Sequence, residues 1–246
     1  MVKISATIVT FNEEKNIGRA IESLRCCDEV VVVDSGSTDR TVTMAQQRGA
    51  RVIVRDWPGY SQQKNFAAAQ AAHDWVFSLD ADEALGEELQ AEVMTLKQSR
   101  LDADAYSMPR LAHYLGKWIR HSGWYPDRKV RLYNRRKAKW TGEYVHENVR
   151  VDGRVADLQS NLLHFTCDSL SAHMKSVDRY TTLAAREVIA SGRKRPGYRL
   201  LVDPMWTGFR SYVLQRGFLD GYEGFTIAYM AALYTFLKYA KARRRE

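Results

Sequence analysis

Apolar and polar positions alternate regularly along the first hundred residues of the chain. Short runs rich in β-branched residues predict strands, and stretches whose apolar residues recur every three or four positions predict helices. Strands are expected at 3–10, 29–34, 51–55 and 74–79, and helices at about 12–24, 37–49, 62–72 and 85–96. Asn12 is expected to cap the first helix. This order predicts an α/β fold with a doubly wound, mostly parallel sheet flanked by helices.

The pattern changes after about residue 104. Strand-like pieces are expected at 105–115, 129–134, 143–151 and 161–165, and a long amphipathic helix follows at 168–190. The segment SGRKRP looks like a linker, and the aromatic, basic residues after it are expected to be helical. We therefore predict an α/β domain over residues 1–166 and a basic, amphipathic helical C-terminal extension over residues 167–246.

Charge is distributed unevenly along the 246 residues. Residues 1–100 hold 11 basic and 15 acidic side chains, a formal net charge of −4, whereas residues 101–246 hold 26 and 14, a net charge of +12. The acidic half could hold a metal and a nucleotide, and the basic half could meet phosphates, nucleic acid or acidic lipid. Three cysteines, two of them adjacent, do not suggest a disulfide framework, and no secretory signal follows Met1, so a cytoplasmic protein is expected.

Three polar clusters follow predicted strands, where an open α/β sheet binds its ligands. They are TFNEE from Thr10, DSGSTD from Asp34 and DADE from Asp80. Asp80 and Asp82 form a D-x-D pair after a buried strand, and their oxygen ligands suit Mg²⁺ or Mn²⁺. Asp34 could accept hydrogen bonds from a nucleotide or could be a turn aspartate. The chain has neither the glycine-rich dinucleotide fingerprint nor a P-loop.

Four stretches together resemble the family 2 glycosyltransferases of the GT-A fold: ATIVTFNEEKNI, EVVVVDSGSTDRT, GYSQQKNFA and WVFSLDADE. The later TGEYVHE, NLLHFT and GFLDGYEGF are similar to the branch of lipopolysaccharide-core glucosyltransferases. The resemblance implies a metal-dependent, inverting hexosyltransferase. Its expected donor is UDP-glucose, and its expected acceptor is a lipid-linked or lipopolysaccharide-core sugar. Residues 1–166 would be the nucleotide-sugar-binding and catalytic domain.

The resemblance also implies roles for individual residues. Asp34 would hold the uracil or ribose, and Lys64 would approach the nucleotide or its diphosphate. Asp82 would be the direct ligand of Mg²⁺ or Mn²⁺. His164, on an apolar strand, would be a second ligand of the metal or diphosphate, or instead a buried hydrogen-bonded histidine. The nucleotide-sugar-binding positions implied in this way are Thr10, Asn12, Glu13, Glu14, Asp34, Lys64, Asp80 and Ala81.

The general base is expected in the segment EYVHE. Glu147 is the first choice and Glu143 the second, because residues 143, 145 and 147 of an extended segment share one face and spacing does not separate them. Either glutamate could instead be the partner in a structural ion pair. Nearby, Arg128 and Arg131 are expected either to face acceptor phosphates or to lie on a solvated basic strand.

The segment GFTIAYMAALYTFL, residues 224–237, is uncharged for 14 residues. It is shorter than the roughly 20 residues that span a bilayer. Aromatic residues precede it and basic residues follow it, which is typical of an interfacial helix on anionic lipid, although a helix buried in a core or a dimer shares this composition. We therefore expect a peripheral protein at the inner face of the cytoplasmic membrane.

Other functions stay open at this point. A protein or peptide acceptor fits the same fold, since one fold serves many functions. A nucleotidyltransferase would need a glycine-rich loop with a basic residue after the first strand, and TFNEEKN is not such a loop. A nucleic-acid-binding module would use the basic half, but the chain lacks the aromatic–basic motifs of an RNA-recognition sheet, so no nucleic-acid partner is expected.

Overall fold

The computed structural model describes residues 1–99, 101–142, 147–191 and 197–244. The chain divides into two compact units. The first unit comprises Met1–Arg110 and Asp127–His164, and the second comprises Leu111–Pro126 and Phe165–Glu246. The expected boundary at residue 166 lies next to Phe165. The pattern of the sequence did not show that Leu111–Pro126 groups with the C-terminal residues.

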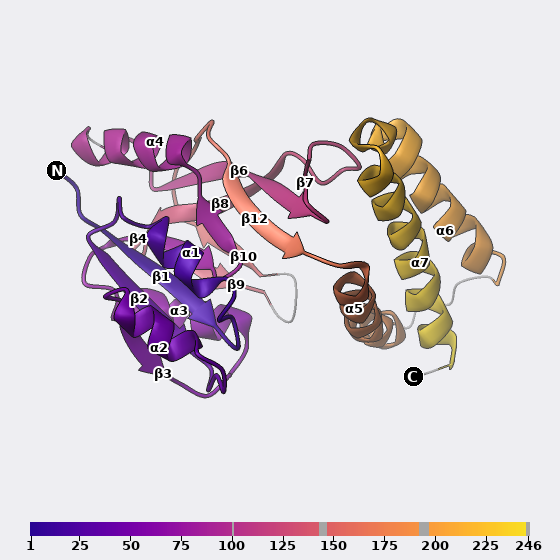
Figure 1. Ribbon diagram of the computed structural model, residues 1–246, viewed down its shortest axis with the longest axis horizontal. Coiled ribbons are helices and arrows are strands. Elements are labelled where there is room, and N and C mark those ends of the chain that lie inside the picture. Colours follow the sequence, from indigo (N-terminus) through magenta and orange to yellow (C-terminus); the bar gives the residue numbers. More distant parts are fainter. Residues whose placement is uncertain (100, 143–146, 192–196, 245–246) are drawn as a thin grey trace. The chain divides into compact units, whose positions relative to one another are not determined.

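The first unit is built on a sheet flanked by helices, which confirms the predicted α/β fold (Figure 1). The strand order is β3-β2-β1-β4-β8-β6-β12-β5, with β11 beside β6, and β9 and β10 form a separate pair. Strands β1 to β4 are parallel, and β8 is antiparallel to β4. The elements are β1 (Ile4–Thr10), α1 (Ile17–Glu22), β2 (Glu29–Asp34), α2 (Thr41–Gln47), β3 (Arg51–Val54), α3 (Tyr60–Gln70), β4 (Trp75–Asp80), β5 (Glu83–Leu85), α4 (Glu87–Gln98), β6 (Ala105–Tyr114), β8 (Asp127–Asn134), β9 (Ala138–Thr141), β10 (Asn148–Val151), β11 (Val155–Asp157) and β12 (Leu162–Cys167).

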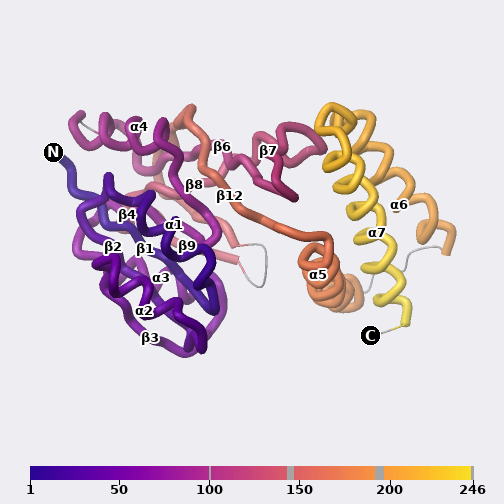
Figure 2. The backbone as a smooth tube through the Cα atoms, viewed as in Figure 1, coloured from indigo at the N-terminus to yellow at the C-terminus, as the bar shows by residue number. Residues whose placement is uncertain are grey.

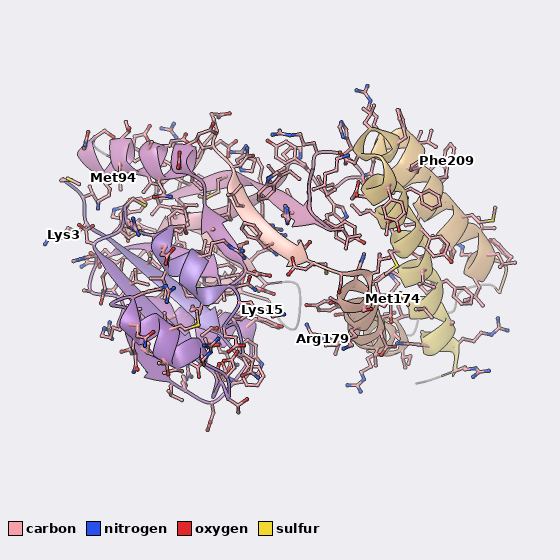
Figure 3. All side chains as sticks on the ribbon, in the orientation of Figure 1. Lys3, Lys15, Met94, Met174, Arg179 and Phe209 are labelled. Carbon is pink, nitrogen blue, oxygen red and sulfur yellow. The ribbon has the colours of Figure 1, made fainter. Side chains whose placement is uncertain are left out.

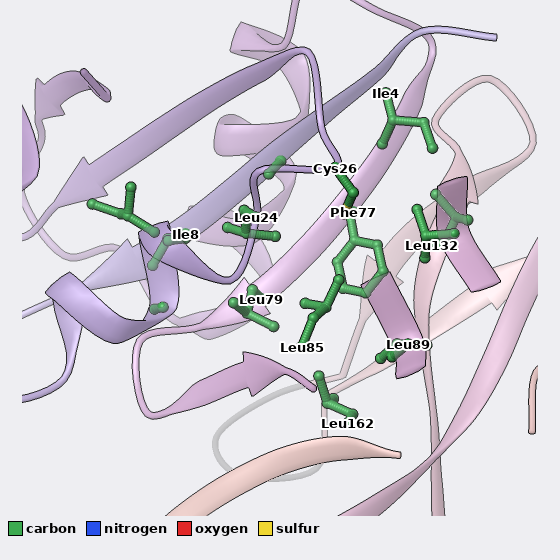
Figure 4. Close-up of a cluster of buried hydrophobic side chains, with 14 of the residues drawn as sticks. Ile4, Ile8, Leu24, Cys26, Phe77, Leu79, Leu85, Leu89, Leu132 and Leu162 are labelled. Atoms are coloured by element: carbon green, nitrogen blue, oxygen red, sulfur yellow. The ribbon is translucent and has the colours of Figure 1, made fainter. Parts of the chain in front are cut away.

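The core of this unit follows from the alternation of side chains along buried strands. On one face of the sheet, Ile8 of β1 joins a large apolar cluster with Leu24, which follows α1, and Leu89 of α4 (Figure 4). On the opposite face, Val33 of β2 packs against Ala67 of α3. Helices therefore cover both faces of the parallel strands. The carboxyl ends of these strands are left to polar residues.

Two local expectations are wrong. Leu85 does not start a helix: it ends β5 and pairs with Leu162 of β12, so α4 begins only at Glu87. Asn12 does not cap α1, which begins at Ile17. Asn12 instead adopts a left-handed conformation, with φ of 54°, and its Oδ1 accepts the backbone N–H of Thr38 at 2.8 Å. Asparagine tolerates this conformation better than most residues, so it can tie the two loops together.

The second unit is mainly helical, as the sequence predicted. Its elements beyond the ends of β6 and β12 are β7 (Lys117–Ile119), α5 (Leu170–Ala190), α6 (Arg199–Phe209), the π-helical turn η1 (Arg210–Leu214), the 3₁₀ turn η2 (Gly217–Asp220) and α7 (Tyr222–Arg244). Helix α5 is capped by Ser169, whose side chain accepts the N–H of Ala172. Helix α7 packs against both α5 and α6 (Figure 2).

A buried carboxylate joins η2 to the segment around β7. Asp220 accepts the backbone N–H of His121 at 2.9 Å and contacts the ring Nδ1 of His121 at 3.0 Å, while its backbone carbonyl accepts a hydrogen bond from Lys117. Two glycines allow η2 and the first turn of α7 to approach each other closely, because a Cβ on Gly224 would collide with the carbonyl oxygen of Gly217. These contacts explain why Leu111–Pro126 groups with the C-terminal helices.

The apolar segment over residues 224–237 lies partly inside this helical unit. Thr226, Ile227, Ala228 and Met230 are buried, so the inner face of α7 is a core face rather than an interfacial one. Among the described residues, none of the helices combines the length and the apolar content that crossing a bilayer would require.

Candidate active site

Three parallel strands end side by side at one edge of the sheet. Thr10 of β1 pairs with Asp34 of β2, and Val9 pairs with Asp80 of β4. Strands in this register present their last residues along the same edge, which is where open α/β sheets bind ligands. The three polar clusters seen in the sequence therefore meet, as their positions after strands indicated.

The ends of β1 and β2 carry buried polar side chains. Asp34 is buried, and its carboxylate accepts the backbone N–H groups of Gly36 at 2.9 Å and Ser37 at 2.7 Å. Asp34 thus has the turn role that the sequence left open. Within the part of the chain that the structure describes, Thr10 Oγ1 and Gln63 Oε1 are buried without a hydrogen-bond partner. Buried polar atoms are normally satisfied, so these two atoms suit a bound polar ligand.

The loop after β1 holds two glutamates in different environments. Glu13 accepts a hydrogen bond from Asn16, and burial raises the pKa of Glu13 above its ordinary value, with the negative charge of Asp82 raising it further. Glu14 contacts Arg40 Nε at 3.4 Å on the exposed surface. Glu13 therefore senses the charge of the D-x-D motif, and Glu14 is paired with Arg40, although both were expected to line a base pocket.

A buried chain of ion pairs contains the first aspartate of the D-x-D motif. Lys64 of α3 contacts Asp80 Oδ1 at 2.8 Å and Glu147 Oε1 at 3.3 Å. Arg131 of β8 contacts Asp80 Oδ2 at 2.7 Å and Glu83 Oε1 at 2.8 Å. Asp80 is thus held between two cations, and Lys64 joins it to the expected general base, Glu147.

The ion pairs dominate the protonation of this cluster. Burial alone would raise the pKa of Asp80, but the positive charges of Lys64 and Arg131 hold the pKa of that carboxyl well below its usual range. Burial alone would lower the pKa of Arg131, and the carboxylates of Glu83 and Asp80 instead raise it above its already high value. The ring of Trp140 lies 4.2 Å from Lys64 Nζ and adds a cation–π contact.

The second aspartate of the motif lies beside a histidine. His164 Nε2 is 3.2 Å from Asp82 Oδ2, because β12 pairs antiparallel with β5 and places His164 opposite Glu83. The described residues contain no group of three or more His, Cys, Asp or Glu side chains that could hold a metal ion. Two protein ligands nevertheless fit Mg²⁺ or Mn²⁺, which typically keeps waters or substrate phosphates as its other ligands.

The structure limits the roles that Ala81 and Arg128 can have, and it does not describe Glu143. The side chain of Ala81 is buried in the core, so only its backbone can face a ligand. Glu143 lies outside the described residues. Arg128 donates to the backbone carbonyls of Ser107 and Leu158, so it braces the strands rather than extending toward acceptor phosphates.

The sequence placed Glu83 in a polar cluster and expected Arg131 to face acceptor phosphates or solvent, but it did not reveal that the two form a buried ion pair beneath Asp80. Glu83 is fully buried, and its carboxylate also accepts the backbone N–H of Asp80 at 3.1 Å. It therefore positions the D-x-D motif. The available signal was an acidic residue directly after D-x-D, but its partner Arg131 comes from a distant strand, so the pair becomes visible only in the fold.

Comparison with known proteins gives matches that include these site residues. The family model described as "Glycosyl transferase family 2" matches residues 5–151, which include the edge from Thr10 to Glu147.

Two curated relatives match nearly the whole chain. An uncharacterised glycosyltransferase of Rickettsia felis is 36% identical over 260 residues, covering 99% of this chain and 90% of the relative. The lipopolysaccharide core biosynthesis glycosyltransferase LpsC of Rhizobium meliloti is 32% identical over 249 residues, covering 98% and 92%.

Among solved structures, the mannosyltransferase PcManGT of Pyrobaculum calidifontis, in complex with GDP-mannose and Mn²⁺, has a TM-score of 0.56 to this chain. It covers 99% of this chain, the match spans 88% of the mannosyltransferase, and the identity is 13%. At this identity the likeness concerns the fold, and it agrees with the GT-A fold that the sequence led us to expect.

Proposed function

Because the chain belongs to glycosyl transferase family 2, we propose that this glycosyltransferase is an inverting enzyme that moves a hexose, with UDP-glucose as the expected donor. The observation that carries the proposal is the ionic cluster at the sheet edge. Asp80 of the D-x-D motif, Lys64 and Glu147 come from three separate segments, and Lys64 Nζ lies 2.8 Å from Asp80 and 3.3 Å from Glu147. Such a cluster would supply positive charge for a diphosphate beside a carboxylate that could take a proton.

The donor nucleotide would lie along the ends of β1 and β2. The unpartnered Oγ1 of Thr10 and Oε1 of Gln63 offer hydrogen bonds to a base or ribose. Asp34 accepts two backbone hydrogen bonds and one from the Ser37 hydroxyl, and it retains acceptor capacity because an ionised carboxylate has about four acceptor positions. Asn12 and Glu13 would complete the pocket, and Glu14, which contacts Arg40, would lie at its margin.

Asp82 and His164 would hold a divalent cation, Mg²⁺ or Mn²⁺, together with the donor diphosphate. When bound, such a cation neutralises negative charge on the leaving group. Lys64 can contribute positive charge from the protein itself, since its ammonium group lies at the same strand end. Arg131 and Glu83 keep Asp80 in place, so the donor meets a preformed motif.

The chemical step requires a base for the acceptor hydroxyl. Glu147 would accept the hydroxyl proton while the acceptor oxygen forms a bond to the anomeric carbon and the bond from that carbon to the diphosphate breaks. Attack from the face opposite the leaving group inverts the configuration in a single displacement. General-base assistance of this kind typically contributes roughly 10²–10⁴-fold to the rate.

The acceptor class rests on the relative from Rhizobium meliloti, whose name assigns it to lipopolysaccharide core biosynthesis. We propose a lipid-linked or lipopolysaccharide-core sugar as acceptor. A cytoplasmic protein held peripherally at the membrane would meet such an acceptor, and the net charge of +12 over residues 101–246 favours contact with anionic lipid. In this proposal residues 1–166 catalyse and residues 167–246 associate with the membrane.

The proposal is tested by donor-dependent turnover. Purified protein is incubated with a panel of UDP-, GDP- and ADP-sugars, with and without Mn²⁺ or Mg²⁺, and released nucleoside diphosphate is measured. We expect slow, cation-dependent hydrolysis of UDP-glucose. Asp82→Asn should lose most of this hydrolysis and most of the cation affinity, because it removes the charged ligand.

Calorimetric titration with UDP and Mn²⁺ provides the second readout. Tight binding of UDP without hydrolysis would identify a donor site that needs its acceptor before turnover. Unchanged cation affinity in Asp82→Asn would remove Asp82 from the metal role. Neither binding nor hydrolysis of any donor would contradict the proposed donor site.

A further inference from the structure

Helix α6 and the turn η1 expose their large apolar residues and bury their small ones. Met205 is 74% exposed, Leu201 is 68% exposed and Trp206 is 56% exposed, whereas Pro204 and Ser211 are buried. Figure 3 labels Phe209 on this helix. The exposed apolar residues recur at helical spacing and form one continuous stripe: Leu201, Val202, Met205, Trp206, Phe209, Val213 and Leu214.

The inward face of α6 is already packed against α7. A Cβ on Gly208 would come within 3.4 Å of Ala232 Cβ and 3.5 Å of the Ala228 carbonyl oxygen, so α6 and α7 approach closely through small residues. Thr235 of α7 donates a hydrogen bond to Thr207 at 3.3 Å. The stripe therefore does not belong to a helix that lacks its partner: the sequence places small residues inside and large apolar residues outside.

The exposed surface continues onto η2 and the first turns of α7. Phe218 is 49% exposed and Phe225 is 55% exposed, and both rings pack against Tyr212 of η1, with centroids 6.3 and 5.9 Å away. Tyr222 and Tyr229 are each 63% exposed on α7. A contiguous apolar surface of this extent on a soluble fold marks an interaction site.

The charges on this surface favour one kind of partner. Among the described residues of α6, η1 and η2, the exposed charged side chains are all basic: Arg199, Arg210 and Arg216. Asp220 is buried against His121, and Asp203 is only partly exposed. Apolar and aromatic residues flanked by cations match the boundary of an anionic bilayer, where tyrosine and tryptophan rings settle at headgroup depth.

We propose that the stripe from Leu201 to Leu214, with the exposed rings of η2 and α7, is a lipid-docking surface on which α6 lies in the plane of an anionic membrane. A second copy of the chain is a poorer occupant, because a two-fold contact through the stripe would bring arginines against arginines. The surface rests on the proposed function, since it specifies how the enzyme would reach a lipid-linked acceptor. This proposal puts the membrane-contacting surface on α6, whereas the sequence suggested the apolar run of α7.

The test is sedimentation with vesicles of phosphatidylglycerol and phosphatidylethanolamine, compared with vesicles of phosphatidylcholine alone. We expect the wild-type chain to bind the anionic vesicles and to be released by high salt. Trp206→Ser with Phe209→Ser should lower the partition coefficient at least about tenfold. Arg199→Glu with Arg210→Glu should abolish the preference for anionic lipid.

A matched control carries the same chemical change in the first unit. Phe11 is 55% exposed and Trp57 is 46% exposed, so Phe11→Ser with Trp57→Ser removes equivalent rings from another surface. This control should bind vesicles as the wild type does. Equal loss in both double variants would show that generic stickiness, rather than the stripe, drives binding, and would overturn the inference.

Two further readouts separate the inference from the proposed function. Sedimentation velocity without lipid reports self-association: a dimer that dissociates in the Trp206→Ser, Phe209→Ser variant would identify a second copy as the occupant and overturn lipid docking. Donor hydrolysis without vesicles should be equal in this variant and the wild type. Vesicle binding together with neither binding nor hydrolysis of any donor would leave the docking surface intact and contradict the proposed function.

Discussion

The first unit buries charged side chains such as Lys64 and Glu83, whereas the second unit exposes large apolar side chains such as Leu201 and Met205. Both arrangements cost free energy relative to an ordinary globular domain, because charge prefers water and apolar surface avoids it. In the first unit, ion pairs offset the cost. In the second unit the described structure contains no cover for the exposed stripe. This difference favours a ligand site inside the first unit and a docking surface on the second unit.

The largest expected effect lies in the interior site. Glu147→Gln should reduce turnover by roughly 10²–10⁴-fold, because the amide cannot accept the acceptor proton. Donor affinity measured by calorimetry should remain close to that of the wild type. Steady-state kinetics with a sugar acceptor provide the measurement.

The same substitution also weakens the contact of Glu147 with Lys64, which is 3.3 Å long. Lys64→Met removes that contact without removing the carboxylate, so it serves as the control. If Lys64→Met lowers donor affinity while Glu147→Gln lowers only turnover, the two roles are separate. Normal turnover in Glu147→Gln would exclude Glu147 as the base.

Two phenylalanines compare the units directly. Phe77 of β4 is fully buried, and Phe77→Ala should destabilise the protein by about 3–5 kcal/mol because it leaves a cavity. Phe209 of α6 is 48% exposed, and Phe209→Ala should change stability by about 0.5 kcal/mol or less. Urea unfolding followed by circular dichroism measures both. A large loss in Phe209→Ala would show that the stripe is covered by protein, contrary to the docking surface.

A further effect, smaller than that of Phe77→Ala, concerns an ion pair near the start of β2 in the first unit. Lys97 is almost fully buried and contacts Asp28 Oδ2 at 2.8 Å. Burial raises the pKa of Asp28, but the hydrogen bonds from Lys97 and from the N–H of Ile4 lower it below its ordinary value. Asp28→Asn should cost about 1 kcal/mol at neutral pH, a low figure because Asp28 remains partly exposed to water.

The lowered pKa fixes how this cost depends on pH. A carboxylate whose pKa falls on folding stabilises the protein above its unfolded pKa, near about 4, and loses that contribution as pH falls through the folded pKa. The urea midpoints of wild type and Asp28→Asn should therefore differ at pH 7 and pH 5 and converge below about pH 4. The control is Asp178→Asn in the second unit. Asp178 is 78% exposed, and its partner Lys241 keeps other oxygen acceptors. The urea midpoint of this variant should therefore equal that of the wild type at every pH.

Periodicity predicted the α/β unit well because its parallel strands are buried on both faces and separated by regular helices. The convergence of Thr10, Asp34 and Asp80 followed from strand ends alone. Local exceptions escaped for physical reasons. Leu85 fits an apolar helical spacing, but antiparallel pairing with Leu162 outweighs that preference.

Features that depend on distant partners could not be predicted. The pairing of Glu83 with Arg131 requires β8 to lie beside β4, which no local pattern encodes. The apolar run of residues 224–237 looked interfacial because composition does not distinguish a core helix from a surface helix. The stripe on α6 was hidden for the converse reason: Pro204 and Gly208 interrupt its sequence, although Pro204 is buried and Gly208 lets α6 approach α7 closely.

The carboxylate of Asp220 has a consequence for the order in which the chain takes shape during its synthesis. Asp220 anchors the backbone N–H of His121 through its carboxylate and the ammonium of Lys117 through its backbone carbonyl, and these groups precede it by 99 and 103 residues. At about 5–20 residues per second, translation leaves these groups without their partner for roughly 5–20 s. The strands of the first unit are already synthesised by then, so the turn around β7 settles only after all of them have been made.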